Sequence, residues 1–318
     1  MKRLRIAVLT PDARPDDPPE RADTFVQARE VVEAIMDLGH EPIPAIWTDL
    51  SGAEALLREM RPDIVFNLVE DLPEGPTQLH KVTALCDELR LRHTGAPTAA
   101  LLASSDKRRM KARLAAAGLP VPPAMTPGDE TTRFIVKSAT EHASHALGPE
   151  DVVVGSTAAE ALIALKIAAH GGPWFAEAYV PGREINQSLL ESARGLVALP
   201  AGEILFLDQE GDAPRVLGHD EKWAEDSEAY RRTPRVRLED APELAAEIEA
   251  LSRAAWRAFG LKGYARVDFR VPEEGRPVIL EVNANPCLSA TAGFCASARD
   301  AGLSQTDVVG NILAAALV

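Results

Sequence analysis

The sequence predicts an α/β fold in which a first domain with a parallel sheet is followed by two smaller parts that mix strands and helices. Strand-like and helix-like patterns alternate over the first third of the chain, an order typical of parallel sheets. The length of 318 residues corresponds to two domains or three small ones. Hydrophobic residues make up 46% of the chain and charged residues 26%, as in folded globular proteins.

The first domain is expected to span residues 1–100. Apolar runs and helical periodicity alternate there, with strands predicted at 4–9, 42–47 and 63–69 and helices at 25–38, 53–60 and 77–91. The polar stretch from Asp12 to Asp23 is expected to be a loop. Thr10-Pro11-Asp12 follows the first strand where a glycine-rich turn would bind a dinucleotide, so the pattern argues against a dehydrogenase.

Residues 101–183 and 184–318 are expected to form the two remaining parts. Ser104 or Ser105 is predicted to cap a helix that runs to Ala117 and ends at Gly118. The further elements follow in order: strands at 134–137, 152–154 and 174–180 around a helix at 158–169, then strands at 184–190 and 204–207, a charged loop at 208–234, a helix at 243–259, a hairpin and a final helix from 306.

Net charge, the N-terminal segment and the cysteines exclude several classes of protein. The net charge of -14 repels nucleic acid and anionic lipid, so we expect neither a nucleic acid nor a membrane as a partner. The apolar run after Met1 is too short for a signal peptide or a spanning helix, which favours a cytoplasmic protein. Cys86, Cys287 and Cys295 are odd in number and lack Cys-x-x-Cys spacing, which indicates neither a disulfide framework nor a zinc site.

The most informative stretch is a predicted hairpin of residues 264–271 and 278–283. Alternation in each strand places polar and apolar side chains on opposite faces. Arg266, Asp268 and Arg270 share one face of the first strand. In the second strand, Glu281 and Asn283 lie opposite an apolar set, which is Val278, Leu280 and Val282.

A direct turn between residues 271 and 278 would pair Asp268 with Glu281 and Arg266 with Asn283, with Cβ atoms about 5 Å apart. Two carboxylates so close are tolerated when one pKa rises or when a divalent cation lies between them. With the amide oxygen of Asn283, they predict a Mg²⁺ or Mn²⁺ site. The alternative is a solvent-facing hairpin whose arginines merely pair with these carboxylates.

Arg266-Val-Asp268-Phe, with Glu281-Val-Asn283-Ala-Asn285-Pro286 beginning thirteen residues after the aspartate, resembles the signature of ATP-grasp carboxylate-amine ligases. The resemblance is to the D-alanine-D-alanine ligase branch in particular. It implies a pre-ATP-grasp first domain followed by a two-subdomain ATP-grasp fold. It also implies ATP-dependent joining of a carboxylate, such as that of an amino acid or peptide, to an amine through an acyl phosphate, with release of ADP and phosphate.

The same resemblance assigns roles to individual residues. Arg266 would stabilise the oxyanion of the tetrahedral intermediate, and Lys222 would neutralise the transferring phosphate. Asp268, Glu281 and Asn283 would hold Mg²⁺ or Mn²⁺. The residues assigned to ATP are Lys107, Lys137 and Lys222 at the phosphates, Glu141 and Ser144 in the phosphate loop, Glu177, Tyr179 and Val180 at the adenine, and Glu184 at the ribose.

The chain departs from the family pattern at three places. The loop after Lys137 lacks the usual glycines, the segment from Thr10 to Glu20 lacks a Ser-x-Glu motif, and Cys287 stands where glycine is usual. The last two belong to substrate recognition in the family, so a preferred product other than D-alanyl-D-alanine is expected. The alternatives are a nucleotide-binding sensor or inactive homologue, and an ATP-grasp enzyme with another acceptor. A homodimer is left open.

Overall fold

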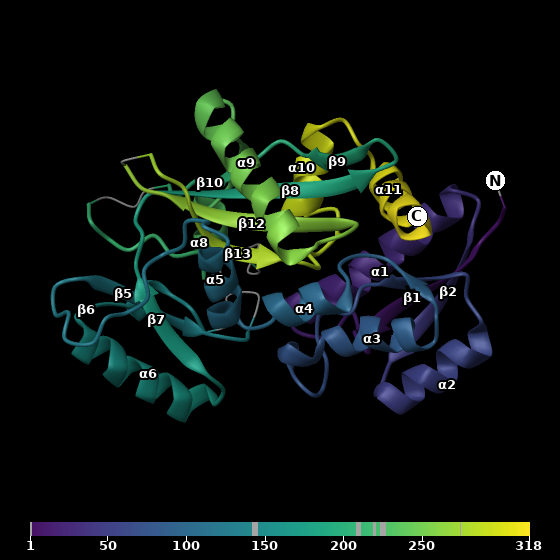
Figure 1. Ribbon diagram of the computed structural model, residues 1–318, viewed down its shortest axis with the longest axis horizontal. Coiled ribbons are helices and arrows are strands. Elements are labelled where there is room, and N and C mark those ends of the chain that lie inside the picture. Colours follow the sequence, from purple (N-terminus) through teal and green to yellow (C-terminus); the bar gives the residue numbers. More distant parts are fainter. Residues whose placement is uncertain (1, 142–145, 208–210, 219–220, 223–226, 274) are drawn as a thin grey trace.

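The computed structural model describes residues 2–141, 146–207, 211–218, 221–222, 227–273 and 275–318, and the strands in these ranges form three sheets. The sheets follow one another along the chain, with β1–β4 in the first, β5–β7 in the second and β8–β13 in the third. Figure 1 shows the first sheet at the right, the second at the lower left and the third across the top. The predicted α/β fold is confirmed, while the domain limits after residues 100 and 183 remain predictions.

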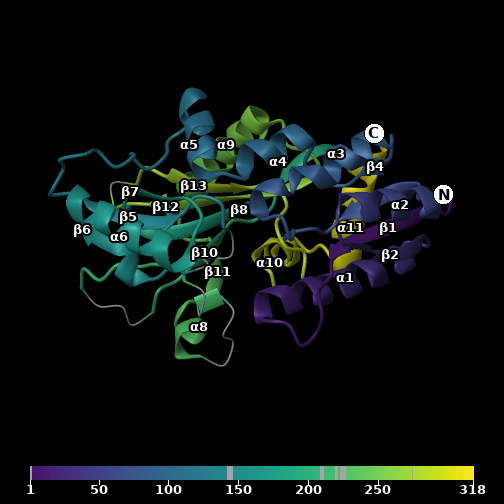
Figure 2. The ribbon, with the colours of Figure 1, turned by 90° about the horizontal axis from the view of Figure 1, so that it is seen from below.

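The first sheet is parallel throughout, with strand order β2-β1-β3-β4. Ile6 and Val8 of β1 pack towards α1 and the C-terminal helix α11 (Gln305–Leu317), whereas Ala7 and Leu9 pack towards α2 and α3. Figure 2 shows helices on both sides of this sheet. The elements of this part are β1 (Arg5–Pro11), α1 (Pro19–Asp37), β2 (Glu41–Trp47), α2 (Leu50–Met60), β3 (Ile64–Asn67), a 3-10 turn (Pro76–Gln78), α3 (His80–Glu88), β4 (Arg92–His93) and α4 (Thr98–Ser104).

The second sheet is a small antiparallel one with strand order β6-β5-β7. Phe134 and Val136 pack against α6, so the alternating positions Ile135 and Lys137 face the other way. This second face is the one turned to the cavity described below. The elements are β5 (Arg133–Ser138), β6 (Val152–Val154), α6 (Ser156–His170) and β7 (Trp174–Ala178).

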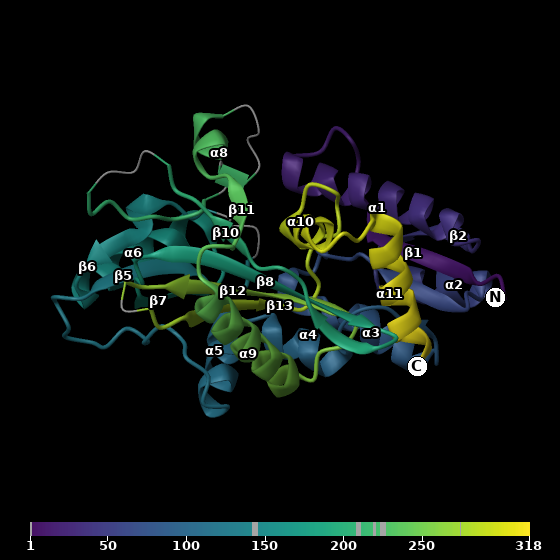
Figure 3. The ribbon, with the colours of Figure 1, turned by 90° about the horizontal axis from the view of Figure 1, so that it is seen from above.

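The third sheet is antiparallel, with the order β11-β10-β8-β12-β13 and with β9 paired to β8. Figure 3 shows α4, α5 and α9 on one side of it and α8 and α10 on the other. Within the described ranges, no helix is both long and apolar enough to cross a bilayer. The elements are α5 (Lys107–Ala116), β8 (Arg183–Ser192), β9 (Gly195–Ala198), β10 (Gly202–Ile204), α8 (Glu228–Arg232), β11 (Arg235–Arg237), α9 (Pro242–Phe259), β12 (Tyr264–Val271), β13 (Val278–Asn283) and α10 (Gly293–Asp300).

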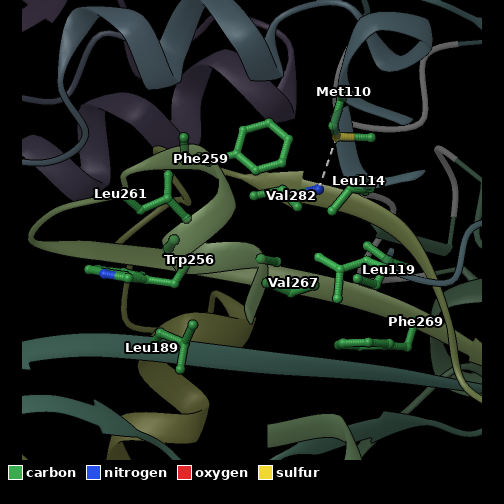
Figure 4. Packing of buried hydrophobic residues seen from close by; sticks show 14 of the residues in the cluster. Met110, Leu114, Leu119, Leu189, Trp256, Phe259, Leu261, Val267, Phe269 and Val282 are labelled. Atoms are coloured by element: carbon green, nitrogen blue, oxygen red, sulfur yellow. Dashed lines mark hydrogen bonds between the residues drawn. The ribbon is translucent and has the colours of Figure 1, made fainter. Parts of the chain in front are cut away.

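A hydrophobic core joins α5 and α9 to the third sheet (Figure 4). Trp256 and Phe259 of α9 and Phe269 of β12 are buried in it. The Met110 sulfur of α5 accepts a hydrogen bond from the backbone N–H of Val282 in β13, at 3.1 Å. Close packing of this kind holds the first turns of α5 against the strand that carries Glu281.

The hairpin of β12 and β13 has the predicted register at its polar end. Asp268 pairs with Glu281, and Arg266 pairs with Asn283. The two carboxyl-bearing residues are therefore direct cross-strand neighbours, as period-2 alternation predicts.

Towards the turn, the predicted register is wrong by one residue. A bulge after Asp268 places Phe269 opposite Ile279, so Leu280 is the extra residue of β13. Ile279 and Val282 are buried, while Leu280 is partly exposed and lines the cavity. Leu280 was predicted on the apolar face, and the bulge is the reason that it lies on the other.

Helix α1 begins at Pro19, six residues before the predicted start at Phe25. The sequence predicts a loop from Asp12 to Asp23, but proline fits the first turn of a helix because an N–H is not needed there. The cap of α5 is Asp106, whose carboxylate accepts from the N–H groups of Arg108 and Arg109. It is therefore neither Ser104 nor Ser105.

Short elements account for the other differences. The loop predicted at 208–234 contains α8, and the strand predicted at 204–207 is β10, which ends at Ile204. Helices and strands absent from the prediction are α4, β4, β9, β11 and α10. Each is too short for periodicity to distinguish it from a loop.

Candidate active site

A cavity of about 1800 Å³ is lined by residues from all three sheet regions. Ser144 lies outside the described residues, and every other residue predicted for the site lines this cavity. They are Lys107, Lys137, Glu141, Glu177, Tyr179, Val180, Glu184, Lys222, Arg266, Asp268, Glu281 and Asn283. The roles assigned to them remain predictions.

Arg266 and Asp268 form a two-point ion pair within β12. Arg266 Nε lies 2.7 Å from Asp268 Oδ1, and Nη2 donates to Oδ2 at 2.9 Å. Asn186 of β8 donates a further hydrogen bond to Oδ1, at 2.8 Å. Burial lowers the pKa of the Arg266 guanidinium, but the Asp268, Glu281 and Glu184 carboxylates together raise it by more, so the pKa lies above its ordinary value.

The surface-hairpin alternative predicted the Arg266–Asp268 pair correctly and its surroundings incorrectly. The side chains of Arg266 and Asp268 are only 22% and 13% exposed, and both line the cavity. Arg270 pairs with Glu184 at 2.7 Å, on the strand to the other side of β12. The ionic face of the hairpin is therefore a wall of the cavity.

Asp268, Glu281 and Asn283 offer a set of oxygen donors that fits Mg²⁺ or Mn²⁺. Each carboxylate oxygen has two lone pairs, so Asp268 Oδ2 can accept from Arg266 and still bind a cation. Among the described residues, no three His, Cys, Asp or Glu side chains are grouped closely enough to hold a metal. A metal at this place would therefore depend on the Asn283 amide and on oxygens of a substrate.

Lys222 brings a second cation to the same part of the cavity. Burial and the nearby Arg266 guanidinium lower the pKa of its ammonium, while the Glu184, Glu281 and Asp268 carboxylates raise it by less. Two cations and three carboxylates therefore face the same part of the cavity, where positive and negative potential lie side by side. This electrostatic environment suits an anionic phosphate that arrives together with a metal ion.

Lys107 begins α5 and connects it with the loop after β5 and with strand β13. Its ammonium donates to the backbone carbonyl of Glu141 and lies 3.8 Å from Glu281 Oε1. Because Asp106 caps α5 at its N–H groups, the first turn is fixed where Lys107 leaves it. The Lys107 ammonium thus lies between the two regions assigned to phosphate and to metal.

Glu177 is held by two lysines, one of which the sequence analysis missed. Lys137 Nζ lies 2.5 Å from Glu177 Oε1, and Lys111 Nζ lies 2.8 Å from Oε2. The carboxylate is 2% exposed. Burial raises the pKa of Glu177, but the two ammonium groups lower it by more, so it lies below the ordinary value.

Glu184 and Tyr179, which were predicted to bind the nucleotide, also have partners within the protein. The Glu184 carboxylate forms an ion pair with Arg270, and Arg270 itself donates to the Gly182 carbonyl at 3.0 Å. The Tyr179 hydroxyl accepts from the backbone N–H of Arg215 at 2.7 Å. These bonds fix Tyr179 and Glu184 at the cavity wall on either side of the β7–β8 connection.

The opposite end of the cavity is formed by α1, the segment after β3 and the segment after β13. The Cys287 thiol donates to Asp23 Oδ2 at 2.9 Å, and burial raises its pKa well above the ordinary value. Glu70 accepts from the Gln27 amide at 2.7 Å, and burial raises its pKa to about 7. No motif in the sequence pointed to Glu70 or Gln27, because the loop after β3 carries no periodic signal.

Comparison with known proteins identifies the relatives of this chain. The family model described as D-ala D-ala ligase C-terminus matches residues 134–314. A D-alanine-D-alanine ligase of Gloeobacter violaceus is 29% identical over 98% of both chains. An uncharacterized protein of Sinorhizobium fredii is also 29% identical, over 90% of this chain and 86% of its own.

A solved structure has the same fold. The D-alanine-D-alanine ligase of Bacillus anthracis complexed with ATP superposes with a TM-score of 0.76, covers 99% of this chain and 97% of its own, and is 18% identical. At that identity the likeness concerns the fold alone.

Proposed function

The chain belongs to the D-Ala-D-Ala ligase family and is an ATP-dependent, ADP-forming ligase, and we propose that it joins an amino acid or peptide carboxylate to an amine through an acyl phosphate. The observation that supports this most is the cavity wall of β12 and β13. There, paired carboxylates and Asn283 meet Arg266 and the Lys107 and Lys222 ammonium groups.

In the proposed reaction, a carboxylate oxygen of the first substrate attacks the γ-phosphorus of ATP, and ADP leaves. The neutral amine then attacks the acyl carbon, its nitrogen loses a proton as the amide forms, and phosphate leaves with the former carboxylate oxygen. Such steps depend mainly on positioning and charge neutralisation. Lys107, Lys137 and Lys222 would bind the phosphates. Asp268 holds Arg266 by two nitrogens, which fixes the guanidinium plane for the oxyanion.

Asp268, Glu281 and Asn283 would hold Mg²⁺, which when bound neutralises phosphate charge. ATP lies, in this proposal, between the second and third sheets. Glu177, Tyr179 and Val180 would meet the adenine, with Glu184 at the ribose and Glu141 and Ser144 at the phosphates. A cytoplasmic location and a homodimer remain predictions.

We further propose that the preferred product is not D-alanyl-D-alanine. Cys287 stands where the family usually has glycine, and its side chain takes up space that close backbone approach would need. Asp23 lies against the Cys287 thiol and lines the cavity. It is the carboxylate best placed to receive a substrate amine in the absence of a Ser-x-Glu segment.

A phosphate-release screen with pairs of amino acids and other amines, with ADP and AMP resolved, tests the function. Substrate-dependent ADP and phosphate are expected, with D-alanine less effective than another substrate in at least one position. ATP binding with no turnover of any pair would favour the sensor alternative. D-alanine as the best substrate in both positions would refute the altered specificity.

A further inference from the structure

Glu177, Lys137 and Lys111 form a cluster of three charged side chains at the part of the cavity that we propose for the nucleotide. Glu177 forms an ion pair with Lys137 through one carboxylate oxygen and with Lys111 through the other, at 2.5 and 2.8 Å. Two ammonium groups share one carboxylate, so the cluster has one positive charge in excess. ATP phosphates would supply the missing negative charge.

The two lysines differ in what else they can reach. Lys137 is the penultimate residue of strand β5, is 13% exposed and lines the cavity. Lys111 is 9% exposed and comes from the face of α5 that packs on β13. Only Lys137 of the two is in contact with the cavity, so it is the one that a phosphate can draw away from Glu177.

Lys111 is anchored at a second point. Its ammonium donates to the backbone carbonyl of Leu280 at 3.0 Å, and Leu280 is the bulged residue of β13. A bulged residue lies outside the regular strand pairing, which makes its carbonyl accessible to a side chain. Lys111 therefore ties Glu177 of β7 to the strand that carries Glu281.

We propose that Lys111 is a positioning residue of the reaction, which keeps the Glu177 carboxylate ionised and in place when Lys137 turns to the phosphates of ATP. A buried carboxylate without a cation is strongly disfavoured and takes up a proton instead. With Lys111 present, Glu177 stays an acceptor for the nucleotide. Burial lowers the pKa of Lys111 to about 8, so at pH 7 it is mainly an ammonium. The inference rests on the proposed use of ATP.

The test compares Lys111→Met with Arg109→Met, an exposed cation on the same helix. For both variants, the affinity for ATP is measured by calorimetry, and kcat and KM are measured by steady-state kinetics. Lys111→Met is expected to weaken ATP binding about tenfold or more, with a much smaller change in kcat, because Glu177 contacts the nucleotide equally before and during the reaction. Arg109→Met is expected to match the wild type.

A double-mutant cycle distinguishes a role of Lys111 that acts through Glu177 from a general structural effect of the substitution. In a Glu177→Gln background, Lys111→Met should cause little further loss, because its partner no longer carries charge. If Lys111→Met does not fold, Lys111→Gln replaces it, since an amide can still donate to Leu280 without the charge, and the same loss of ATP affinity is expected.

Equal ATP affinity in the wild type and in the folded Lys111 variant would overturn this inference alone. The inference would also be overturned if Lys111→Met weakened ATP binding in the Glu177→Gln background by the same factor as in the wild type. A wild-type chain that does not bind ATP would instead overturn the proposed function.

Discussion

The two ends of the cavity treat their carboxylates differently. At the end that we propose for the nucleotide, Glu177 and Asp268 are each within ion-pair distance of a lysine or arginine. At the end that we propose for the substrate, Asp23 accepts from the Cys287 thiol, and Glu70 accepts from the Gln27 amide, both of which are neutral donors. The pKa of Glu177 is correspondingly lowered, and that of Glu70 is raised to about 7.

This difference suggests that the two ends of the cavity bind ligand groups of different charge. Balanced ion pairs can exchange one partner for a phosphate or a metal without leaving a bare charge. A carboxylate bonded only to neutral donors favours an arriving ammonium group as its counter-ion, because the positive charge lowers the raised pKa and ionises the carboxyl group. The contrast predicts that variants at the nucleotide end act on chemistry and ATP, and variants at the substrate end on specificity.

The largest effect is expected for Glu281→Gln. Loss of one metal-binding carboxylate should lower kcat about 10²-fold or more, while relief of the repulsion with Asp268 should leave the thermal midpoint unchanged or slightly higher. Steady-state kinetics and thermal unfolding measure both, with exposed Glu247→Gln in α9 as the control. A variant that simply unfolds would show that the pair is structural.

Lys222→Ala should come next, with a loss in kcat of about 10- to 10²-fold that exceeds the rise in KM for ATP. The reason is that a cation facing developing charge acts mainly in the transition state. Lys262→Ala, an exposed lysine, is the control. Unchanged kcat would dismiss the assigned role of Lys222.

Asp23→Asn tests the other end. It should lower kcat/KM for the preferred amino substrate about tenfold or more and leave KM for ATP unchanged, because an amide cannot pair with an ammonium as a carboxylate does. Asp37→Asn, an exposed aspartate of the same helix, is the control. A rise in KM for ATP alone would contradict the division of the cavity.

Glu70→Gln should give the smallest effect on turnover, and its effect on stability should depend on pH. The pKa of Glu70 is about 7 in the fold and 4.5 in a free chain, so the folded state binds more protons between these values. Glu70 thus costs stability progressively as pH rises from about 4.5 through 7. The variant should therefore gain about 1 to 3 kcal/mol relative to the wild type at pH 8, and little at pH 4.5. Urea unfolding at both values measures this, and an equal difference at both would refute the raised pKa.

The sequence predicted the residues that regular strands carry. Asp268 and Glu281 came from alternation in two strands joined by a short turn, and their pairing is confirmed. Lys111 could not be found in this way, because its run of cations in α5 resembles a solvated helix face and its partner Glu177 is distant in sequence. Leu280 was misplaced because a bulge leaves no local sequence signal and inverts the faces beyond it.

The central claim is that ATP phosphorylates a substrate carboxylate at the wall formed by β12 and β13. Its most direct test uses the preferred amino acid labelled with ¹⁸O in its carboxylate, with mass analysis of the products. Transfer of one ¹⁸O to inorganic phosphate, with ADP as the nucleotide product, is predicted. The label in AMP, with release of pyrophosphate, would contradict the claim.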